Sequence, residues 1–359
     1  MGRYLVTGGA GYVGSHTVLA LRDRGEAVVV LDDLSKGHRA AVPQGVTLVA
    51  GRCDDRAVLA QAFAQGPFDA VLHFAALSLV GDSMREPLRY MAENLGGLAA
   101  VAEATVRSGC RKLVMSSTAA LFGFPERVPI DEAQGHAPVS PYGESKLICE
   151  QALVWAERIH GLRYASLRYF NAAGADAEGR AGEDHDPETH LLPLAIDAAL
   201  GRRPPLTVFG TDYPTPDGTC VRDYVHVTDL AEAHLRVLPL LEARSVRYNL
   251  GNGTGYSVRQ VMQAVERVGG RPVPHALGPR RDGDPAVLVA SSALLRAETG
   301  WTPRFPELDD IVRTAWDWRV AHPQGYAGVA PASLTRSGPG AAAPSLHSAL
   351  PPLRGERAG

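Results

Sequence analysis

Short runs of aliphatic and β-branched residues alternate with stretches of helical length through the first half of the chain. The runs predict strands over residues 3–7, 27–31, 46–50, 70–74, 112–116 and 164–167, and the stretches between them predict helices over 15–24, 57–65, 91–108 and 141–159. Strands that alternate with helices form parallel βαβ units, and nearly continuous apolar runs are typical of strands covered on both faces. The pattern therefore predicts an α/β fold, a Rossmann-like doubly wound parallel sheet.

The alternation ends near residue 173. A polar loop over 174–188 is followed by shorter elements, with helices expected over 191–200, 228–241 and 257–268 and strands over 206–209 and 246–250. We expect residues 1–173 to form the sheet domain, to which some later segments return, and residues 174–326 to form a smaller α/β lobe. Residues 327–359 are dominated by Ala, Pro, Ser and Gly without periodicity, which predicts a disordered tail.

The composition narrows the class of protein. Among 359 residues, 45% are apolar and 21% charged, which is apolar enough for a buried core. The formal net charge is −3, so no basic field favours a nucleic acid or an anionic membrane as partner. No apolar run is long enough for a membrane span, and we expect no secretion signal from the first residues. The four cysteines form no Cys-x-x-Cys pair, which is typical of reduced thiols. We expect a soluble cytoplasmic protein.

Directly after the first predicted strand, residues 8–14 read Gly-Gly-Ala-Gly-Tyr-Val-Gly. Glycines at this spacing allow a tight turn and close approach of the backbone to a pyrophosphate, while the following helix directs free N–H groups at the phosphates. An ordinary turn between a strand and a helix can also be rich in glycine. The residues of this turn expected to contact a dinucleotide are Gly8, Gly11, Tyr12, Val13 and Gly14.

The choice of dinucleotide depends on Asp32, which ends the second predicted strand. An acid at this position accepts a hydrogen bond from the ribose 2′-hydroxyl and repels a 2′-phosphate. Lys36, His38 and Arg39 lie close by in the sequence and would suit the additional phosphate of NADP. Because Asp32 occupies the deciding position, the sequence predicts NAD as the cofactor.

Tyr142 and Lys146 are four residues apart, on one face of a predicted helix. Lowering the pKa of a tyrosine from about 10 towards neutrality takes about 4 kcal/mol, and one cation about 4 Å away at an effective dielectric of about 20 supplies about that much. Lys146 is therefore expected to make Tyr142 a general base. A surface pair on an amphipathic helix would show the same spacing. Thr118, at the end of the fifth strand, adds a hydroxyl where ligands bind in such sheets.

These elements, in this order, resemble the extended short-chain dehydrogenase/reductase family and, within it, the UDP-glucose 4-epimerases. The similarity extends over roughly residues 3–326. The segments that show it are 6–16 (VTGGAGYVGSH), 73–76 (HFAA), 168–171 (RYFN), 213–227 (YPTPDGTCVRDYVHV), 280–285 (RRDGDP) and 322–326 (HPQGY).

The resemblance implies an activity and its participants. Tyr142 would take the proton of the sugar 4-hydroxyl through Thr118, the C4 hydride would pass to a tightly held NAD, and the 4-keto sugar would turn and take the hydride back on its other face. UDP-glucose and UDP-galactose would be interconverted in galactose metabolism, and the protein would be a homodimer. Residues 1–173 would then be the NAD-binding domain and residues 174–326 the nucleotide-sugar-binding lobe.

The resemblance also implies further contact residues. The cofactor would touch Phe74, Ala75, Asn94, Tyr142, Lys146 and Phe170. The substrate would touch Thr118, Asn171, His190, Leu191, Thr207, Phe209, Arg222, Arg281 and Asp284. The two arginines would hold the diphosphate, because guanidinium groups match its geometry.

Three positions depart from the family pattern. Arg52 stands where an acid commonly reads the adenine, so Asp54 or a backbone carbonyl would have to accept from it. Ser78 replaces a lysine and removes one charge near the cofactor phosphates. Leu288 replaces a bulky tyrosine of some members, which would let the pocket accept N-acetylated sugars.

Alternative functions follow from the same residues. A different UDP-sugar 4-epimerase, acting on UDP-GlcNAc and UDP-GalNAc, differs only in pocket size. A nucleotide-sugar dehydratase needs an acid and a base after the Ser-Ser-Thr segment, where this chain has Ala119 and Ala120. A non-catalytic NAD-binding regulator would not need the Tyr142 pair. The acidic run 183–186 is expected to be a solvated loop, so no metal site is predicted.

Overall fold

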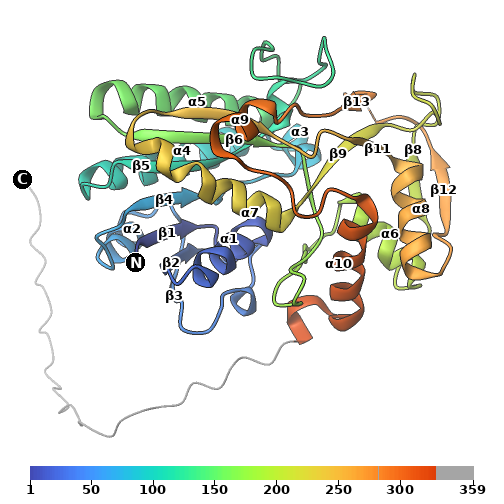
Figure 1. Ribbon diagram of the computed structural model, residues 1–359, viewed down its shortest axis with the longest axis horizontal. Helices are drawn as coiled ribbons and strands as arrows, with labels where there is room; N and C mark the ends of the chain where they lie inside the picture. Colours follow the sequence, from blue (N-terminus) through green and yellow to red (C-terminus); the bar gives the residue numbers. More distant parts are fainter. Residues whose placement is uncertain (282, 329–359) are drawn as a thin grey trace, which may run out of the picture. The chain divides into compact units, whose positions relative to one another are not determined.

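The computed structural model describes residues 1–281 and 283–328 (Figure 1). Its largest sheet has seven strands in the order β10-β6-β5-β4-β1-β2-β3, and every neighbouring pair is parallel. The strands are β1 (Arg3–Thr7), β2 (Ala27–Asp32), β3 (Thr47–Ala50), β4 (Ala70–His73), β5 (Lys112–Thr118), β6 (Arg163–Tyr169) and β10 (Val246–Leu250). This order, which grows outward in both directions from β1, confirms the predicted doubly wound sheet.

Helices cover both faces of this sheet (Figure 1). On one face lie α1 (Tyr12–Asp23) and α7 (Val227–Arg236), and on the other lie α2 (Arg56–Phe63), α4 (Pro87–Arg107) and α5 (Pro141–His160). The alternation along β1 shows why the strands read as continuous apolar runs. Val6 packs into the core beneath α1 and α7, whereas its neighbour Leu5 packs into the core beneath α2, α4 and α5.

A second group of elements encloses a separate apolar core. Its β-structure comprises β7 (Asn171–Ala173), β8 (Leu206–Phe209), β9 (Val221–His226), β11 (Gly255–Ser257), β12 (His275–Gly278) and β13 (Val287–Leu288). Strand β9 pairs with β7, β11 and β13, and β8 pairs with β12. The helices that pack here are α6 (Leu191–Ala199), α8 (Val258–Gly269) and α10 (Leu308–Ala321).

The remaining elements are the short helices α3 (Val80–Arg85) and α9 (Ala293–Thr299) and the 3₁₀ turns Arg39–Ala41, Ala119–Leu121, Leu238–Glu242 and Gly325–Gly328. No helix in the part of the chain that the structure describes has the length and apolar character to cross a membrane. The expected tail begins at residue 327, and positions 329–359 of it lie outside the described residues.

Two sequence-based boundaries differ from the structure for local reasons. The helix expected over 228–241 ends at Arg236 and continues as a 3₁₀ turn, because Pro239 cannot donate the hydrogen bond that an α-helix needs. The helix expected from residue 91 already begins at Pro87, which suits the first turn because its missing N–H would have no helical partner. Helix α8 begins at a capping box that Ser257 and Gln260 form.

The parallel sheet brings the predicted chemistry to one edge. Gly8, Asp32, Phe74 and Thr118 lie at or just after the carboxyl ends of β1, β2, β4 and β5. The pairing registers place Thr7 beside Leu31 and His73, and Thr118 beside Tyr169. Carboxyl ends of parallel strands share an edge of the sheet, and ligands bind there.

Candidate active site

The turn between β1 and α1 forms a cradle without side chains. Gly8 has a φ of 70°, and a Cβ there would lie 2.5 Å from the Ala75 nitrogen. A Cβ on Gly14 would lie 2.0 Å from the Gly8 carbonyl oxygen, so only glycine fits at either position. At the start of α1, Gly11 provides no side-chain cap, and the first turn contains no acidic residue. The free N–H groups and the helix dipole therefore suit a pyrophosphate.

Asp32 lies beside this cradle with its carboxylate oriented by the backbone. Its Oδ2 accepts from the Ala10 nitrogen at 2.9 Å, and its Oδ1 accepts from the Leu34 nitrogen at 2.8 Å. Burial raises the pKa of Asp32, and these backbone hydrogen bonds lower it. The carboxylate is thus in place to accept from a ribose hydroxyl, as the sequence predicts for NAD.

Two of the three basic residues that follow Asp32 contact a different loop. Lys36 donates from Nζ to the Asp186 carbonyl oxygen at 2.6 Å. His38 contacts Asp184 instead, with 2.9 Å between Nε2 and the backbone oxygen. Both side chains are engaged by the loop before α6, so Asp32 remains the group that faces the ribose position.

Tyr142 and Lys146 lie on the first two turns of α5, which begins at a capped N-terminus. Ser140 accepts from the Gly143 nitrogen at 3.2 Å through Oγ. Lys146 is buried, with 3% of the residue exposed, and it donates to the Ser116 carbonyl oxygen at 3.0 Å. Thr118 follows Ser116 by two residues on β5, so the same strand end positions both the lysine and the hydroxyl.

The electrostatics differ from the sequence-based prediction in one respect. Burial raises the pKa of Tyr142 well above its usual value of 10, Tyr169 raises it further, and a hydrogen bond from Thr118 lowers it. Burial also lowers the pKa of Lys146. The two-charge estimate made from the sequence omitted the cost of desolvating the phenolate, and this cost opposes the lowering of the Tyr142 pKa expected from Lys146 and the nicotinamide ring.

Helix α5 is fixed by two contacts that the sequence analysis missed or assigned differently. Asn94 on α4 accepts from the Leu77 nitrogen at 2.8 Å and donates to Ser145 Oγ at 2.9 Å. The resemblance assigns Asn94 to the cofactor; here its amide joins the loop after β4 to α5. The second contact is Glu150, which accepts from Ser117 Oγ at 2.6 Å and pairs with Arg168 at 2.9 and 2.6 Å.

Among the missed residues, a signal existed for Glu150 and Arg168. Glu150 lies four residues after Lys146, on the same face of α5, and Arg168 belongs to the RYFN segment quoted above. Both side chains are 3% exposed. A charge pair that is buried in this way requires a partner for each member, but the partners come from different elements, so spacing alone does not identify them.

Five residues expected at the nucleotide lie around β8, β9 and the segment before β13. Arg222 pairs with Asp284, and the guanidinium of Arg281 lies 4.2 Å from the ring centroid of Phe209. The Asp284 nitrogen donates to the Arg281 carbonyl oxygen at 3.4 Å. Thr207 lies on the same strand as Phe209 and is exposed. The predicted ligands of the diphosphate and the base thus contact one another.

The remaining predicted residues lie between these two groups or behind them. Phe74 packs 4.8 Å from the His234 ring, and Phe170 and Asn171 are half-buried between β6 and β9. Tyr12 donates from its hydroxyl to the Gly174 carbonyl oxygen at 2.6 Å. Val13 lies in the first turn of α1, and His190 precedes Leu191 at the start of α6.

Arg52 explains how the departure near the adenine position is accommodated. Its guanidinium donates to both carboxylate oxygens of Asp54, at 2.9 and 2.8 Å, and to Glu93 at 3.4 Å. Asp54 was one of two expected acceptors for the adenine amine, and its carboxylate is occupied by Arg52. Arg52 and Asp54 thus neutralise each other here, and the choice of adenine acceptor between Asp54 and a backbone carbonyl stays a prediction.

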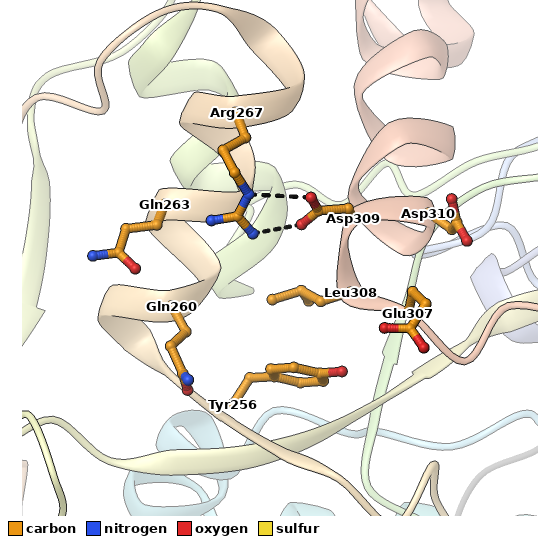
Figure 2. A pocket seen from close by; sticks show the side chains of 8 residues that line it. All are labelled: Tyr256, Gln260, Gln263, Arg267, Glu307, Leu308, Asp309 and Asp310. Carbon is orange, nitrogen blue, oxygen red and sulfur yellow. Dashed lines mark hydrogen bonds and ion pairs between the residues drawn. The ribbon is translucent and has the colours of Figure 1, made fainter.

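A cavity of about 550 Å³ lies elsewhere, between α8 and the start of α10. Figure 2 shows that most of its lining side chains are polar and that Arg267 on α8 reaches Asp309 on α10. The two hydrogen bonds of this pair are 3.1 and 2.6 Å long. Tyr256 and Glu307 also line it. None of the predicted cofactor or substrate residues lines this cavity, so it does not belong to the candidate active site.

Two comparisons of the sequence with known proteins point to one family. A family model described as the NAD dependent epimerase/dehydratase family matches residues 4–251. A UDP-glucose 4-epimerase of Halalkalibacterium halodurans is 47% identical over 324 residues, which is 90% of this chain and 97% of that protein.

Two solved structures are similar over most of their length. One is a UDP-glucose 4-epimerase from Brucella ovis in complex with NAD, with a TM-score of 0.85, 45% identity and coverage of 88% of this chain and 98% of that one. The other is a UDP-glucose 4-epimerase from Bifidobacterium longum in complex with NAD⁺ and UDP, with a TM-score of 0.86, 35% identity and coverage of 90% and 99%.

Proposed function

Because this chain belongs to the NAD-dependent epimerase/dehydratase family, we propose that it inverts the C4 carbon of UDP-glucose and UDP-galactose, with NAD as a resident cofactor. The observation that supports this most directly is the position of Tyr142, Lys146 and Thr118 at the strand edge that also holds the glycine cradle and Asp32. This edge of the sheet thus carries a proton acceptor and a dinucleotide-binding turn. Oxidation and reduction of one carbon require both.

Residues of the protein accept the proton of the sugar hydroxyl and later return it. Tyr142 accepts the proton of the sugar 4-hydroxyl, and Thr118 bridges the two oxygens through its own hydroxyl. Lys146 holds a positive charge beside the phenolate and is oriented by the Ser116 carbonyl. When bound, NAD⁺ supplies a hydride acceptor for C4 and a positive ring that lowers the cost of the phenolate. After the keto sugar has turned, C4 would regain the hydride on its opposite face and the sugar oxygen would regain the proton from Tyr142, which completes the inversion.

The nucleotide end of the substrate meets residues that already contact each other. Arg222 and Arg281 would hold the diphosphate, Asp284 the uridine ribose, and Thr207 and Phe209 the uracil. Arg281 lies over Phe209, where the base is expected, and Arg222 is paired with Asp284. Binding therefore requires Arg281 to leave the Phe209 ring and turn towards the phosphates. His190, Leu191 and Asn171 would contact the sugar or its phosphate.

Elimination chemistry is disfavoured by the residues after Thr118. Ala119 and Ala120 form a short 3₁₀ turn and offer no group that could move a proton. A dehydratase needs an acid and a base there to expel water. A non-catalytic regulator is disfavoured as well, because the buried lysine and the half-buried tyrosine impose a desolvation cost that simple NAD binding does not need.

The proposal is tested by incubating the purified protein with UDP-galactose and no added cofactor. We expect UDP-glucose as the product and one NAD per chain in the denatured extract. A 4-keto-6-deoxy sugar as the product would establish the dehydratase instead. Absence of any product, with NAD present in the extract, would establish the regulator.

We also propose that the protein is a homodimer joined through α4 and α5. These helices pack against each other and leave large apolar side chains in solvent, with Leu88 81%, Trp155 60% and Ile159 67% exposed. Light scattering on the protein as it elutes from a sizing column should give twice the chain mass, and Trp155→Asp should give the monomer.

A cytoplasmic location is proposed from the four cysteines, which are all free thiols.

A further inference from the structure

The loop before α6 gathers four side chains that the proposed reaction does not explain. Glu183, His185, Glu188 and His190 each present one ligand atom, and these four atoms all lie within 4.8 Å of one another. The sequence analysis expected this acidic run to be a solvated loop. In the structure, Glu183 of this run and the nearby Glu188 have side chains only 8% and 10% exposed, whereas Asp186 is exposed.

Two atoms of this cluster are buried without a hydrogen-bond partner. Glu188 Oε2 and His185 Nδ1 have no such partner, although they face each other at 3.6 Å. A carboxylate oxygen that is nine-tenths buried and unpartnered is costly. A ligand between the two atoms would satisfy both of them.

The distances within the cluster fit a small cation. The nitrogen–oxygen contacts are 2.9 Å for His190 with each of the two glutamates, 3.4 Å for His185 with Glu183 and 3.6 Å for His185 with Glu188. Ligands bound tetrahedrally at about 2 Å from Zn²⁺ lie about 3.3 Å from one another. The observed contacts fall on both sides of that value, so small side-chain movements would complete the coordination.

Contacts that use other atoms hold the loop in place. Asp184 accepts from the Tyr326 nitrogen at 2.8 Å, and the Asp186 carbonyl accepts from Lys36 at 2.6 Å. The His185 ring lies edge-on to Tyr12 of the glycine turn, with 6.1 Å between centroids. The four ligand side chains are therefore brought together by neighbouring groups and do not depend only on one another.

We propose that Glu183, His185, Glu188 and His190 bind one Zn²⁺ ion, or another divalent transition metal of the same ligand preference. Two imidazole nitrogens and two carboxylate oxygens suit such an ion, whereas Ca²⁺ and Mg²⁺ prefer oxygen ligands throughout. The two carboxylates neutralise its charge. The ion ties the loop to the dinucleotide turn through His185 and Tyr12, and it uses Nδ1 of His190, which leaves Nε2 outside the cluster and available to the substrate. Its role is structural, and it takes no part in the reaction at Tyr142.

The test measures metal directly. The protein is stripped with a chelator, dialysed against Zn²⁺ and then against metal-free buffer, and the bound zinc is counted by plasma mass spectrometry. We expect one zinc per chain, a higher melting temperature than the stripped protein has, and visible absorption bands of tetrahedral Co²⁺ after cobalt loading. Equal retention of Ca²⁺ or Mg²⁺, or less than about a tenth of a zinc per chain, would overturn the proposal.

The zinc affinity of variants distinguishes the four proposed ligands from other residues of the same loop. Glu188→Gln preserves shape, and His185→Ala removes one imidazole; each should weaken zinc binding at least about tenfold in competition with a chromophoric chelator. Asp186→Asn is the matched control, because its exposed side chain belongs to the same loop but not to the cluster; it should bind zinc as the unaltered protein does. Circular dichroism and bound NAD report whether each variant is folded. Unchanged zinc affinity in folded Glu188→Gln would contradict the assignment.

Discussion

In the half of the site that holds Tyr142, the buried anchor is Glu150, whereas in the half that would hold the nucleotide it is Asp223. Glu150 is neutralised by Arg168 and also binds Ser117. Asp223 is fully buried and accepts only backbone N–H groups, from Asn252 at 2.7 Å and from Gly253 and Ala290 at 3.0 Å each. Burial raises the pKa of Asp223 to about 6.

This difference matches what each half must do. The Glu150 pair joins α5 to β5 and β6, so the proton acceptor and its lysine are held before any ligand arrives. Asp223 joins β9 to two loops but leaves its neighbour Arg222, and Arg281 with it, on partners that the substrate must displace. The first half is preorganised for chemistry, and the second adjusts on binding.

The largest expected effect on turnover comes from removing Tyr142, the proton acceptor of the preorganised half. Tyr142→Phe should lower kcat about 10²- to 10⁴-fold, because it removes general acid–base catalysis and little volume. Bound NAD should remain, as measured in the denatured extract. Tyr90→Phe is the control, since the Tyr90 ring lies edge-on to Tyr142 at 6.5 Å and its hydroxyl accepts only from Leu79. Loss of NAD from Tyr142→Phe would mean that the phenol is structural.

Replacing the buried anchor Glu150 should lower the free energy of unfolding more than replacing a charge at the surface does. Glu150→Gln leaves Arg168 buried without a counter-charge, so the free energy of unfolding should fall by about 3–5 kcal/mol in urea titrations. Glu103→Gln breaks an exposed pair with Arg107 on α4 and should cost less than about 1 kcal/mol. Equal losses in the two variants would show that the Glu150 pair does not anchor α5.

How much of the fold and the site can be predicted from the sequence depends on how far apart the interacting residues lie along the chain. The strands, the glycine turn and the Tyr142–Lys146 spacing are local, and the seven-stranded sheet confirms the first of these. Glu150 meets Ser117 33 residues away and Asp223 meets Ala290 67 residues away. Neither pairing has a periodic signal, because it arises only when the elements pack. The desolvation of Tyr142 is of the same kind, which is why the sequence-based estimate of its pKa omitted it.

Arg281→Ala tests whether the nucleotide half works by rearrangement. Loss of a charged contact to the diphosphate should raise KM for UDP-galactose about 10- to 100-fold, while kcat changes little because α5 is untouched. Arg280→Ala is a neighbouring control, since Arg280 pairs with Asp212 at the surface and stacks on Tyr213. A fall in kcat with unchanged KM would place Arg281 in the rigid half instead.

Leu288→Tyr tests how much space the nucleotide half of the site leaves for the sugar of the substrate. Leu288 is paired in register with Arg222, on β13 beside β9, so its side chain is close to the proposed diphosphate site. We expect the original protein to convert UDP-N-acetylglucosamine and the variant to do so about tenfold more slowly, with UDP-glucose turnover preserved. Val287→Ile, on the alternate face of the strand, should change neither rate. Failure of the original protein to convert the N-acetylated sugar, while it converts UDP-glucose, would defeat this prediction.

The smallest expected effect distinguishes the two anchors by pH. Because the pKa of Asp223 is higher in the folded chain than the usual 3.8, the folded state binds the proton more tightly. Stability from this group is therefore gained as the pH falls through about 6 and is lost again as the pH rises through that value. Relative to Asp223→Asn, which has no such proton, the unaltered protein should gain about 1 kcal/mol of unfolding free energy between pH 7 and pH 5. Urea titrations of both proteins at the two pH values measure this difference, and parallel profiles would show that Asp223 keeps an ordinary pKa despite its burial.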